Sequence, residues 1–273
     1  MNTRPLILEV LWGPGQGRKA VVDAGGLLTV GSAAKAGWCL DFDPGLAPVH
    51  FEVRWDGEVA EVRAAPGATL QVDGHATHGA RSGHGGWLRV GATDLALTIQ
   101  HFSPPDVEPT AAVCELAAPV IAALERLPGR RFALIDTIRS RRIHTILRES
   151  PAPWRSLYDG PQGDALAEAA PALVVLERDE QLLYDLVQEG WEAGWGLFIA
   201  APQDRDVDLV RQHLRKFLRV KLGLETVYFR FYDPRVFATF VPTCTPEERR
   251  ELLGDLSWYV IDERARGLVA YRA

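Results

Sequence analysis

Cysteine, methionine and long apolar runs are scarce in this sequence. Its 273 residues include one methionine and three cysteines, Cys39, Cys114 and Cys244, without a CxxC pair. Cysteines spaced so widely are typical of reduced thiols in a cytoplasm and do not fit a disulfide framework or a zinc site. No stretch approaches the roughly 18 uninterrupted apolar residues of a membrane-spanning helix, and the first residues lack the pattern of a signal peptide. We therefore expect a cytoplasmic protein without a membrane partner.

An excess of positive charge is also lacking. The chain has 36 acidic and 30 basic side chains, which give a formal net charge of −6. This balance argues against nucleic acid as a partner that is recognised by bulk charge. Hydrophobic residues make up 47% of the chain and charged residues 24%. Because these fractions are close to those of average soluble proteins, a packed core that needs no disulfide or metal is expected.

The common catalytic motifs are absent as well. The sequence contains no GxxxxGK[ST], GxSxG or HExxH pattern, so neither a phosphate-binding loop, a hydrolase elbow nor a zinc protease site is encoded. His75, His78 and His84 share a glycine-rich loop without a cysteine or carboxylate pattern, which favours solvated loop histidines over metal ligands. Cys244 with His213 is a conceivable nucleophile and base, but a lone cysteine is more often a small buried side chain. We expect no enzyme, no catalytic residue, no metal and no cofactor.

The first hundred residues carry a period-two apolar pattern with frequent glycine turns. Short strands of this kind, separated by turn residues, indicate an all-β sandwich over residues 1–103. The clearest strand candidates are residues 6–11, 51–55, 59–63 and 95–99. A proline-rich stretch from Ser103 to Pro109 cannot continue a strand ladder. It begins a linker with a helix at 104–130, in which the alanine-rich segment from Thr110 to Leu127 is helical and Pro119 is the place for a kink.

From residue 131 to 273, apolar strands alternate with amphipathic helices, which predicts an α/β domain with a mixed sheet. The expected strands are 132–135, 172–176, 197–200 and 227–231, and the expected helices are near 140–149, 180–190 and 206–220. The first three strands are apolar throughout, which suits strands that are covered on both faces. Two helix starts are marked by Asp233-Pro234 and by the capping box that begins at Thr245.

Trp191 and Trp195 bracket an expected helix-to-strand turn. Large aromatic side chains are highly buried on average, so packing in the core is the favoured role. Aromatic residues are also enriched where proteins bind each other. We therefore also name both tryptophans as candidates for partner contact.

Arg230, Tyr232 and Arg235 are further candidates for partner binding. Arginine presents a planar fork that holds a carboxylate or the C-terminus of a partner helix, and it is enriched at binding hot spots. An internal ion pair with Asp233 or Asp159 is the alternative, and we favour it slightly. Tyr232 is expected to alternate with its neighbours along a strand.

The sandwich region resembles a forkhead-associated (FHA) domain. The matching segments are Val30-Gly31-Ser32, Ala47-Pro48-Val49-His50 and Val72-Asp73-Gly74. Members of that family bind phosphothreonine through an arginine and a serine, and Ser32 and Ala47 stand at these two positions here. Gly31 and His50 remain, and both suit loop architecture. The resemblance therefore implies a degenerate FHA-like sandwich that has lost phosphopeptide binding.

Residues 131 to 262 are similar to a bacterial domain of unknown function that is found in type VI secretion adaptor (effector chaperone) proteins. The matching blocks, in the order of the family, are Ser156-Leu157-Tyr158-Asp159-Gly160 with Ala170-Pro171-Ala172-Leu173-Val174, Glu189 to Phe198, His213 to Leu218, Tyr228 to Val236, and Val241 to Glu248. The resemblance implies a non-enzymatic protein that binds a toxic effector in the cytoplasm and delivers it to the VgrG spike of the secretion machine.

Three functions are therefore compared. The leading hypothesis is an adaptor that holds an amphipathic helix of an effector in an apolar groove of the α/β domain. The alternative is a phosphothreonine-dependent regulatory protein that acts through the sandwich. The third is a hydrolase with Cys244 as its nucleophile, which would require a reactive thiolate.

Overall fold

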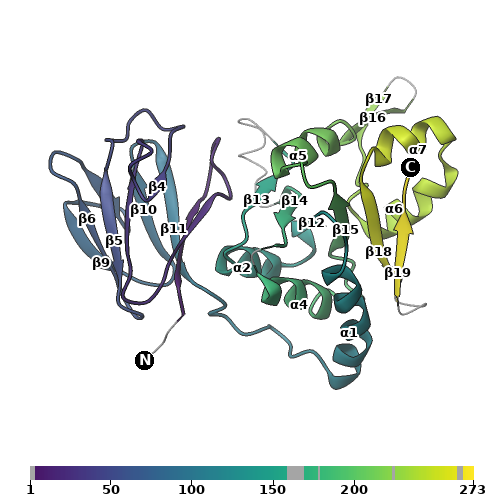
Figure 1. The fold of residues 1–273 in the computed structure, drawn as a ribbon, viewed down its shortest axis with the longest axis horizontal. Helices are drawn as coiled ribbons and strands as arrows, with labels where there is room; N and C mark the ends of the chain where they lie inside the picture. The colour runs from purple at the N-terminus through teal and green to yellow at the C-terminus, as the bar shows by residue number, and fades with distance from the viewer. Residues whose placement is uncertain (1–3, 159–168, 178, 223–224, 263–266) are drawn as a thin grey trace. The chain divides into compact units, whose positions relative to one another are not determined.

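The computed structural model describes residues 4–158, 169–177, 179–222, 225–262 and 267–273. The chain forms two compact units (Figure 1). Unit 1 consists of residues 1–104 and 148–153, and unit 2 of residues 105–147 and 154–273. Relative to the expected organisation, most of the segment 104–130 joins unit 2, and six residues from the second half of the chain join the sandwich.

Unit 1 is a sandwich of two sheets. The six-stranded sheet has the order β2-β1-β11-β10-β7-β8, and the five-stranded sheet has the order β4-β3-β5-β6-β9. The strands of the first sheet are β1 (Leu6–Val10), β2 (Lys19–Val22), β7 (Leu70–Val72), β8 (His75–Thr77), β10 (Gly86–Val90) and β11 (Thr93–Ile99). Those of the second are β3 (Leu27–Gly31), β4 (Trp38–Cys39), β5 (Phe51–Trp55), β6 (Ala60–Ala64) and β9 (Gly79–Ser82). Strand β4 pairs with β3 in parallel, and the other described pairings are antiparallel.

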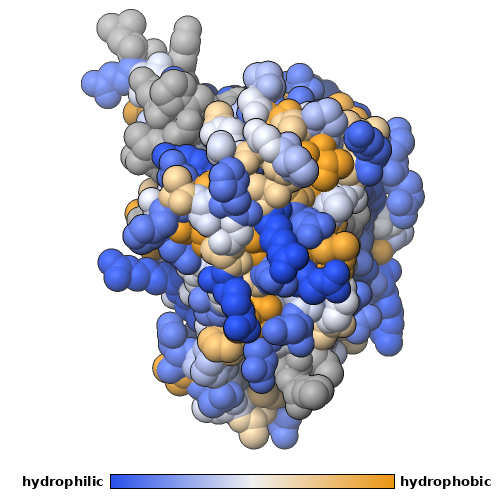
Figure 2. Space-filling model, turned by 90° about the vertical axis from the view of Figure 1, so that its left-hand side faces the viewer, coloured by the Kyte–Doolittle hydropathy of each residue, from blue (hydrophilic) through white to orange (hydrophobic). Residues whose placement is uncertain are grey.

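The period-two pattern of the sequence sets the two faces of the second sheet. In β5, Phe51, Val53 and Trp55 are fully buried, whereas Glu52 and Arg54 point to the other side. This alternation places the apolar residues between the sheets, where their burial stabilises the sandwich. Figure 2 shows the side of the molecule on which β5, β6 and β9 lie, with mostly hydrophilic residues and smaller hydrophobic areas between them.

Strand β1 departs from alternation because both of its faces are covered. All five of its residues are buried, including Glu9. Residues 148–153 hydrogen-bond to the strands and loops around it: the Lys19 ammonium donates to the carbonyl of Ser150 (2.7 Å), and the Thr98 hydroxyl donates to the carbonyl of Arg148 (2.9 Å). The Glu149 carboxylate also accepts from the backbone N–H of Ser103 (2.7 Å). The sandwich is therefore completed by a segment that is distant in sequence.

Unit 2 is built on a sheet with the order β13-β14-β12-β15-β18-β19. Its strands are β12 (Arg130–Ile135), β13 (Trp154–Ser156), β14 (Ala172–Val175), β15 (Gly196–Ala201), β18 (Ser257–Asp262) and β19 (Gly267–Tyr271). We expected a mixed sheet, but all five pairings are antiparallel. The apolar runs correctly predicted that both faces are covered, but burial on both faces does not determine the direction of a strand.

Helices cover the sheet of unit 2 on both faces. They are α1 (Ala111–Glu125), α2 (Arg141–Glu149), α4 (Glu180–Gln188), α5 (Val207–Arg215), α6 (Pro234–Phe240) and α7 (Pro246–Leu253), with 3₁₀ turns η1 (Thr137–Arg139) and η3 (Val241–Thr243). Phe132 and Leu134 share a core with residues of α5, α6 and α7. Ile135 and Phe198 lie on the opposite face near Leu186 of α4, and α1 packs beside α4 (Figure 1).

A separate two-stranded hairpin corrects two expectations. It consists of β16 (Arg219–Leu222) and β17 (Glu225–Tyr228). The helix expected at 206–220 therefore ends at Arg215, and the strand expected at 227–231 ends at Tyr228. After it, a turn closed by the Asp233 N–H and the Arg230 carbonyl (3.0 Å) leads into α6. This turn buries Tyr232 beside Phe231, so these two residues do not alternate.

The expected helix starts are confirmed. Thr245 caps α7 in a reciprocal capping box with Glu248, and Asp233 caps α6 by accepting from the N–H of Arg235. Thr110 caps α1, which contains Pro119. Among the helices that the structure describes, none combines the length and the apolar character that a membrane span requires.

Candidate functional site

The predicted partner-binding residues converge at one end of the sheet of unit 2. Strand β12 ends at Ile135, and the next residue, Asp136, donates its backbone N–H to the carbonyl of Trp195 (2.7 Å). Asp233 begins α6 nearby. The strand end, the loop before β15 and the start of α6 thus bring together side chains that lie almost a hundred residues apart in sequence.

Two aspartates and three arginines form an ion-pair cluster at this end. The Asp136 carboxylate accepts from Arg139 Nε (3.2 Å) and from Arg230 Nη2. The Asp233 carboxylate accepts from Arg235 Nε (3.1 Å), Arg235 Nη2 (2.9 Å) and Arg139 Nη2. Arg139 therefore bridges the two carboxylates. With both carboxylates ionised, the cluster has one positive charge in excess.

The surroundings of Asp233 favour its ionised form. Burial alone would raise the pKa of Asp233, but the hydrogen bonds from the Arg235 side chain and backbone outweigh burial and hold the pKa below its ordinary value. The hydrogen bond to Asp136 raises the pKa of Arg230. The alternative that we favoured for Arg230 and Arg235, an internal ion pair, is thus present in the structure. Arg235 pairs with Asp233 as expected, Arg230 pairs with Asp136 instead, and Asp159 lies outside the described residues.

Tyrosines extend this cluster toward the β16–β17 hairpin. Tyr232 is buried, and this burial together with a hydrogen bond to Tyr158 raises the pKa of its phenol. The Arg230 guanidinium lies 5.9 Å from the centroid of the Tyr232 ring. The ring centroids of Tyr158 and Tyr228 are 6.1 Å apart. The Tyr228 hydroxyl accepts a hydrogen bond from Arg219 Nη2 (3.0 Å).

We call the connected set the Arg–Tyr network. Its members are Asp136, Arg139, Tyr158, Arg219, Tyr228, Arg230, Tyr232, Asp233 and Arg235. The carboxylates are its buried part: the side chain of Asp136 is 1% exposed, while those of Arg230 and Arg235 are 44% and 67% exposed. The surface above the carboxylates is therefore made of guanidinium groups and aromatic rings. Such a surface can hold a carboxylate through paired N–H donors and can stack against planar groups.

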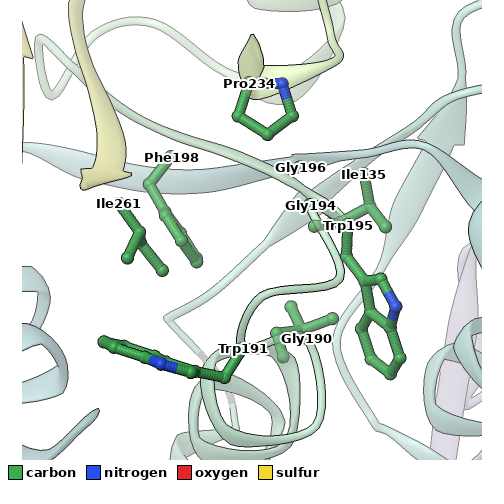
Figure 3. A pocket seen from close by; sticks show the side chains of 10 residues that line it. Ile135, Gly190, Trp191, Gly194, Trp195, Gly196, Phe198, Pro234 and Ile261 are labelled. Carbon is green, nitrogen blue, oxygen red and sulfur yellow. The ribbon is translucent and has the colours of Figure 1, made fainter. Parts of the chain in front are cut away.

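The two tryptophans lie beside this network and line a small hollow (Figure 3). Figure 3 shows Trp191 near Phe198 and Ile261, with Trp195 across the hollow near Ile135. Both tryptophans are buried, which agrees with the core role that we favoured for them. The hollow encloses only about 30 Å³, far below the roughly 300–1,000 Å³ of a typical small-molecule site. It is also too small to hold a helix, so the tryptophans support the neighbouring surface through packing.

Glycines let the loop between α4 and β15 fold onto the end of β12. A Cβ at Gly196 would overlap the carbonyl of Leu134, and a Cβ at Gly190 would overlap the carbonyl of Leu186. Gly194 has a φ of +62°, in the left-handed region that favours glycine. The glycines of this block therefore allow the close approach that places Trp195 against Asp136.

The candidate phosphopeptide positions of unit 1 have structural roles. A Cβ at Gly31 would overlap the carbonyl of Pro48, so only glycine fits there. The Ser32 hydroxyl donates to the carbonyl of Leu46 (2.9 Å). His50 accepts from the N–H of Ala47 through Nδ1 (3.1 Å), and its Nε2 lies 2.8 Å from the carbonyl of Thr69. These contacts tie the loops before and after His50 together.

The remaining candidates do not converge on a shared site. His213 Nε2 lies 2.9 Å from the carbonyl of Leu252, and the Cys244 thiol points to the carbonyl of Phe240 (3.7 Å). Burial, and to a lesser degree Glu248, raises the pKa of Cys244. His84, expected in solvent, stacks on Phe102 with ring centroids 4.1 Å apart. Within the described ranges, no three His, Cys, Asp or Glu residues gather as a metal site.

Sequence reasoning found three of the nine network residues as partner candidates, namely Arg230, Tyr232 and Arg235. It named Asp233 as their ion-pair partner and helix cap, but it gave no role to Asp136 or Arg139. A polar residue directly after an apolar strand was the available signal for Asp136, because strand ends carry functional side chains to the edge of a sheet. Nothing local in the sequence identified its second partner, Arg230, which lies 94 residues away.

Comparison with known families gives a match for part of the chain. Residues 131–251 match the family described as Domain of unknown function (DUF4123), which is less than half of the chain. The match runs from β12 into α7 and includes every member of the Arg–Tyr network. None of the curated proteins compared with the chain matches it.

Solved structures that are similar to part of the chain include several FHA domains. One comes from a study of phosphothreonine-dependent FHA domain interactions, with 22% identity, 37% of this chain and 98% of that chain covered, and a TM-score of 0.32. The FHA domain of the CT664 protein from Chlamydia trachomatis has 20% identity, coverage of 34% and 96%, and a TM-score of 0.32. The cytoplasmic domain of the sorting platform protein PscD from P. aeruginosa has 24% identity, coverage of 39% and 89%, and a TM-score of 0.32.

Proposed function

We propose that this protein is a non-enzymatic adaptor that binds a type VI secretion effector in the cytoplasm and assists its loading onto the VgrG spike. The observation that carries the proposal is the DUF4123 match over residues 131–251. The same stretch contains the five sequence blocks that resemble secretion adaptors. The family match and the resemblance of the blocks concern the same stretch of the chain, and both support the proposal.

The surface of unit 2 supports a role in binding another polypeptide. Tyrosine and arginine are enriched among residues that dominate protein–protein binding energy. The Arg–Tyr network places four arginines and an exposed tyrosine on one connected surface, and buried aspartates hold three of these arginines in position. In this proposal, unit 2 contacts the effector.

Unit 1 has a supporting part in the proposal. Ser32 and His50 connect its FHA-like loops through hydrogen bonds. Ser32 stands at the position where the FHA family, which the sandwich resembles, has a phosphate-binding arginine. We assign to the sandwich the selection of the effector or the contact with the spike, through a surface that does not require phosphorylation.

The decisive experiment is to identify a candidate toxin encoded next to the gene of this protein and to co-express it with the full chain. Because an adaptor must hold its effector before secretion, we expect the two proteins to elute together in size-exclusion chromatography at a defined stoichiometry. A toxin from an unrelated secretion cluster, with the same affinity tag, is the control. Separate elution of the chain and the neighbouring toxin would count against the proposal.

A second arm tests the loading step. Purified VgrG encoded in the same cluster is added to the effector with and without the adaptor. We expect the effector to be retained on immobilised VgrG at a higher level when the adaptor is present. Equal retention in both samples would leave effector binding intact but remove the loading role.

A further inference from the structure

We propose that the Arg–Tyr network is the docking site for an acidic segment of the effector, with a carboxylate on the arginines and apolar side chains on the flanking surface. This inference rests on the proposed adaptor function and names the chemistry of the partner. Three properties of the network support it: its positive charge, the restricted conformation of its arginine side chains and the exposed apolar residues at its two ends.

Charge is the first argument. The cluster holds three guanidinium groups against two carboxylates, and Arg219 adds a fourth guanidinium at the far end of the network. The carboxylates are buried beneath the guanidiniums, so an approaching partner meets positive charge first. This surface is cationic in a chain whose formal net charge is −6. Opposite charge on the partner segment is therefore the complementary choice.

The restricted conformation of the arginine side chains is the second argument. Arg139 bridges Asp136 and Asp233, and Arg235 holds Asp233 through both Nε and Nη2. These contacts restrict the rotamers of long side chains before any partner arrives. Binding then loses less side-chain entropy than it would at flexible surface arginines. The bidentate Arg235–Asp233 pair also shows that the local geometry suits carboxylates.

Arg230 is the guanidinium best placed to receive the partner. One of its N–H groups, Nη2, donates to Asp136, and the side chain remains almost half exposed above Tyr232. An arginine has five N–H donors. Arg230 can therefore keep its internal pair while it donates to a carboxylate of another chain.

The apolar borders are the third argument. Ile138, next to Arg139, is 61% exposed, and Tyr228 at the other end of the network is 56% exposed. Large hydrophobic side chains beside a cationic centre fit a segment in which acidic and apolar residues alternate or share a helix face. A purely acidic segment would make no apolar contact with Ile138 or Tyr228.

The test is a set of charge variants measured against the effector that co-elutes with the chain. Arg230→Gln and the double variant Arg230→Glu/Arg235→Glu remove or reverse the positive charge. Arg205→Gln is the matched control, because Arg205 is a half-exposed arginine of the same unit that pairs with Asp255 (2.7 Å). Dissociation constants are measured by isothermal titration at two salt concentrations, and circular dichroism and thermal melting verify that each variant is folded.

We expect Arg230→Gln to weaken effector binding about tenfold and the double reversal about a hundredfold, as for hot-spot residues. Arg205→Gln should change the dissociation constant less than about twofold. Added salt should weaken the wild-type complex more than the complex of the double variant. Tyr228→Ala, which leaves all the ion pairs in place, should weaken binding without changing the salt dependence.

The effector side supplies the confirming measurement. Hydrogen exchange in the complex identifies the effector segment that becomes protected, and this segment should contain Asp or Glu next to apolar residues. Replacing its acidic residue by arginine should restore part of the binding of the double-reversal variant. An unchanged dissociation constant in the double-reversal variant would overturn the docking site but leave the adaptor function standing. If the wild-type chain binds no effector, both proposals fail.

Discussion

Lys19 and Glu9 face each other across the β1–β2 pairing and form an ion pair in which each side chain is only 1% exposed. Their charged atoms are 3.6 Å apart, and Lys19 also donates to the carbonyl of Ser150. Ions withdrawn from water in this way are stable only with each other and with hydrogen bonds around them. The pair therefore links the folding of the sandwich to the distant segment 148–153.

Removing one partner of this pair should strongly destabilise unit 1. We expect Lys19→Ala to lower the free energy of unfolding of the sandwich by about 3–5 kcal/mol, because Glu9 would stay buried without its counter-charge. The double variant Glu9→Leu/Lys19→Met should recover most of this loss. Urea unfolding followed by hydrogen exchange at β1 reports on unit 1 alone. The exposed pair Arg63–Glu61 provides the control, since Arg63→Ala should change stability by less than about 1 kcal/mol.

Asp43 should give the sandwich a specific acid sensitivity. Burial would raise the pKa of Asp43, but hydrogen bonds from Thr93 (2.6 Å) and from the N–H groups of Gly45 and Ala92 (both 2.9 Å) hold the pKa below its ordinary value. A carboxylate whose pKa is lower in the folded state stabilises the fold at pH values above its unfolded-state pKa of 3.8. This contribution is lost as the pH falls through the folded-state pKa.

The variant Asp43→Asn tests this acid sensitivity. It should lower stability at pH 7 by about 1–3 kcal/mol, because an amide cannot accept all three hydrogen bonds. Unfolding measured between pH 2 and pH 7 should then show a smaller loss on acidification than in the wild type. A parallel pH dependence in the two proteins would contradict the role of Asp43.

Phosphothreonine peptides should not bind to the sandwich with micromolar affinity. Ser32 and Ala47 stand where the FHA family, which the sandwich resembles, has an arginine and a serine. The Ser32 hydroxyl also already donates to the carbonyl of Leu46. Isothermal titration with phosphothreonine peptides and their unphosphorylated counterparts measures this directly. Micromolar binding that depends on the phosphate, without the changes Ser32→Arg and Ala47→Ser, would favour the regulatory alternative.

The Cys244 thiol should react slowly with iodoacetamide at neutral pH. Burial raises its pKa, so the thiolate fraction at pH 7 is smaller than in a free cysteine. Mass spectrometry of the alkylated chain over time, with glutathione in the same tube as a reference, gives the relative rate. Alkylation of Cys244 faster than that of glutathione would revive the hydrolase hypothesis.

Local signals in the sequence predicted several of the elements, but not β13, β18 or β19. The strands at 51–55 and 132–135 and the caps at Asp233 and Thr245 follow from alternation, apolar runs and capping chemistry, which act over a few residues. The helix expected at 206–220 was too long because the amphipathic stripe continues past Arg215, where the chain turns into the hairpin. Over a few residues, the same apolar pattern fits a helix or a strand. The pairing of β16 with β17 decides for the strand.

The candidate site was predicted only in part, for a related reason. Arg230 and Arg235 were found because arginine next to aspartate is visible in the sequence. Arg139 and Asp136 were not, because each also pairs with a residue 94 positions away, Asp233 or Arg230, which lies near it only in the folded chain. The tryptophans were expected in the core and are buried, and the hollow that they line is small.

Composition, periodicity and capping thus determined by themselves that this chain has a β-sandwich half and an α/β half, since these properties depend on neighbours in sequence. Only the tertiary structure decided that all strands of the second sheet are antiparallel, that residues 148–153 complete the sandwich, and that Asp136 meets Arg230. These relationships depend on contacts between residues far apart in the chain, where a charge or an apolar side chain finds its partner only after the backbone has folded.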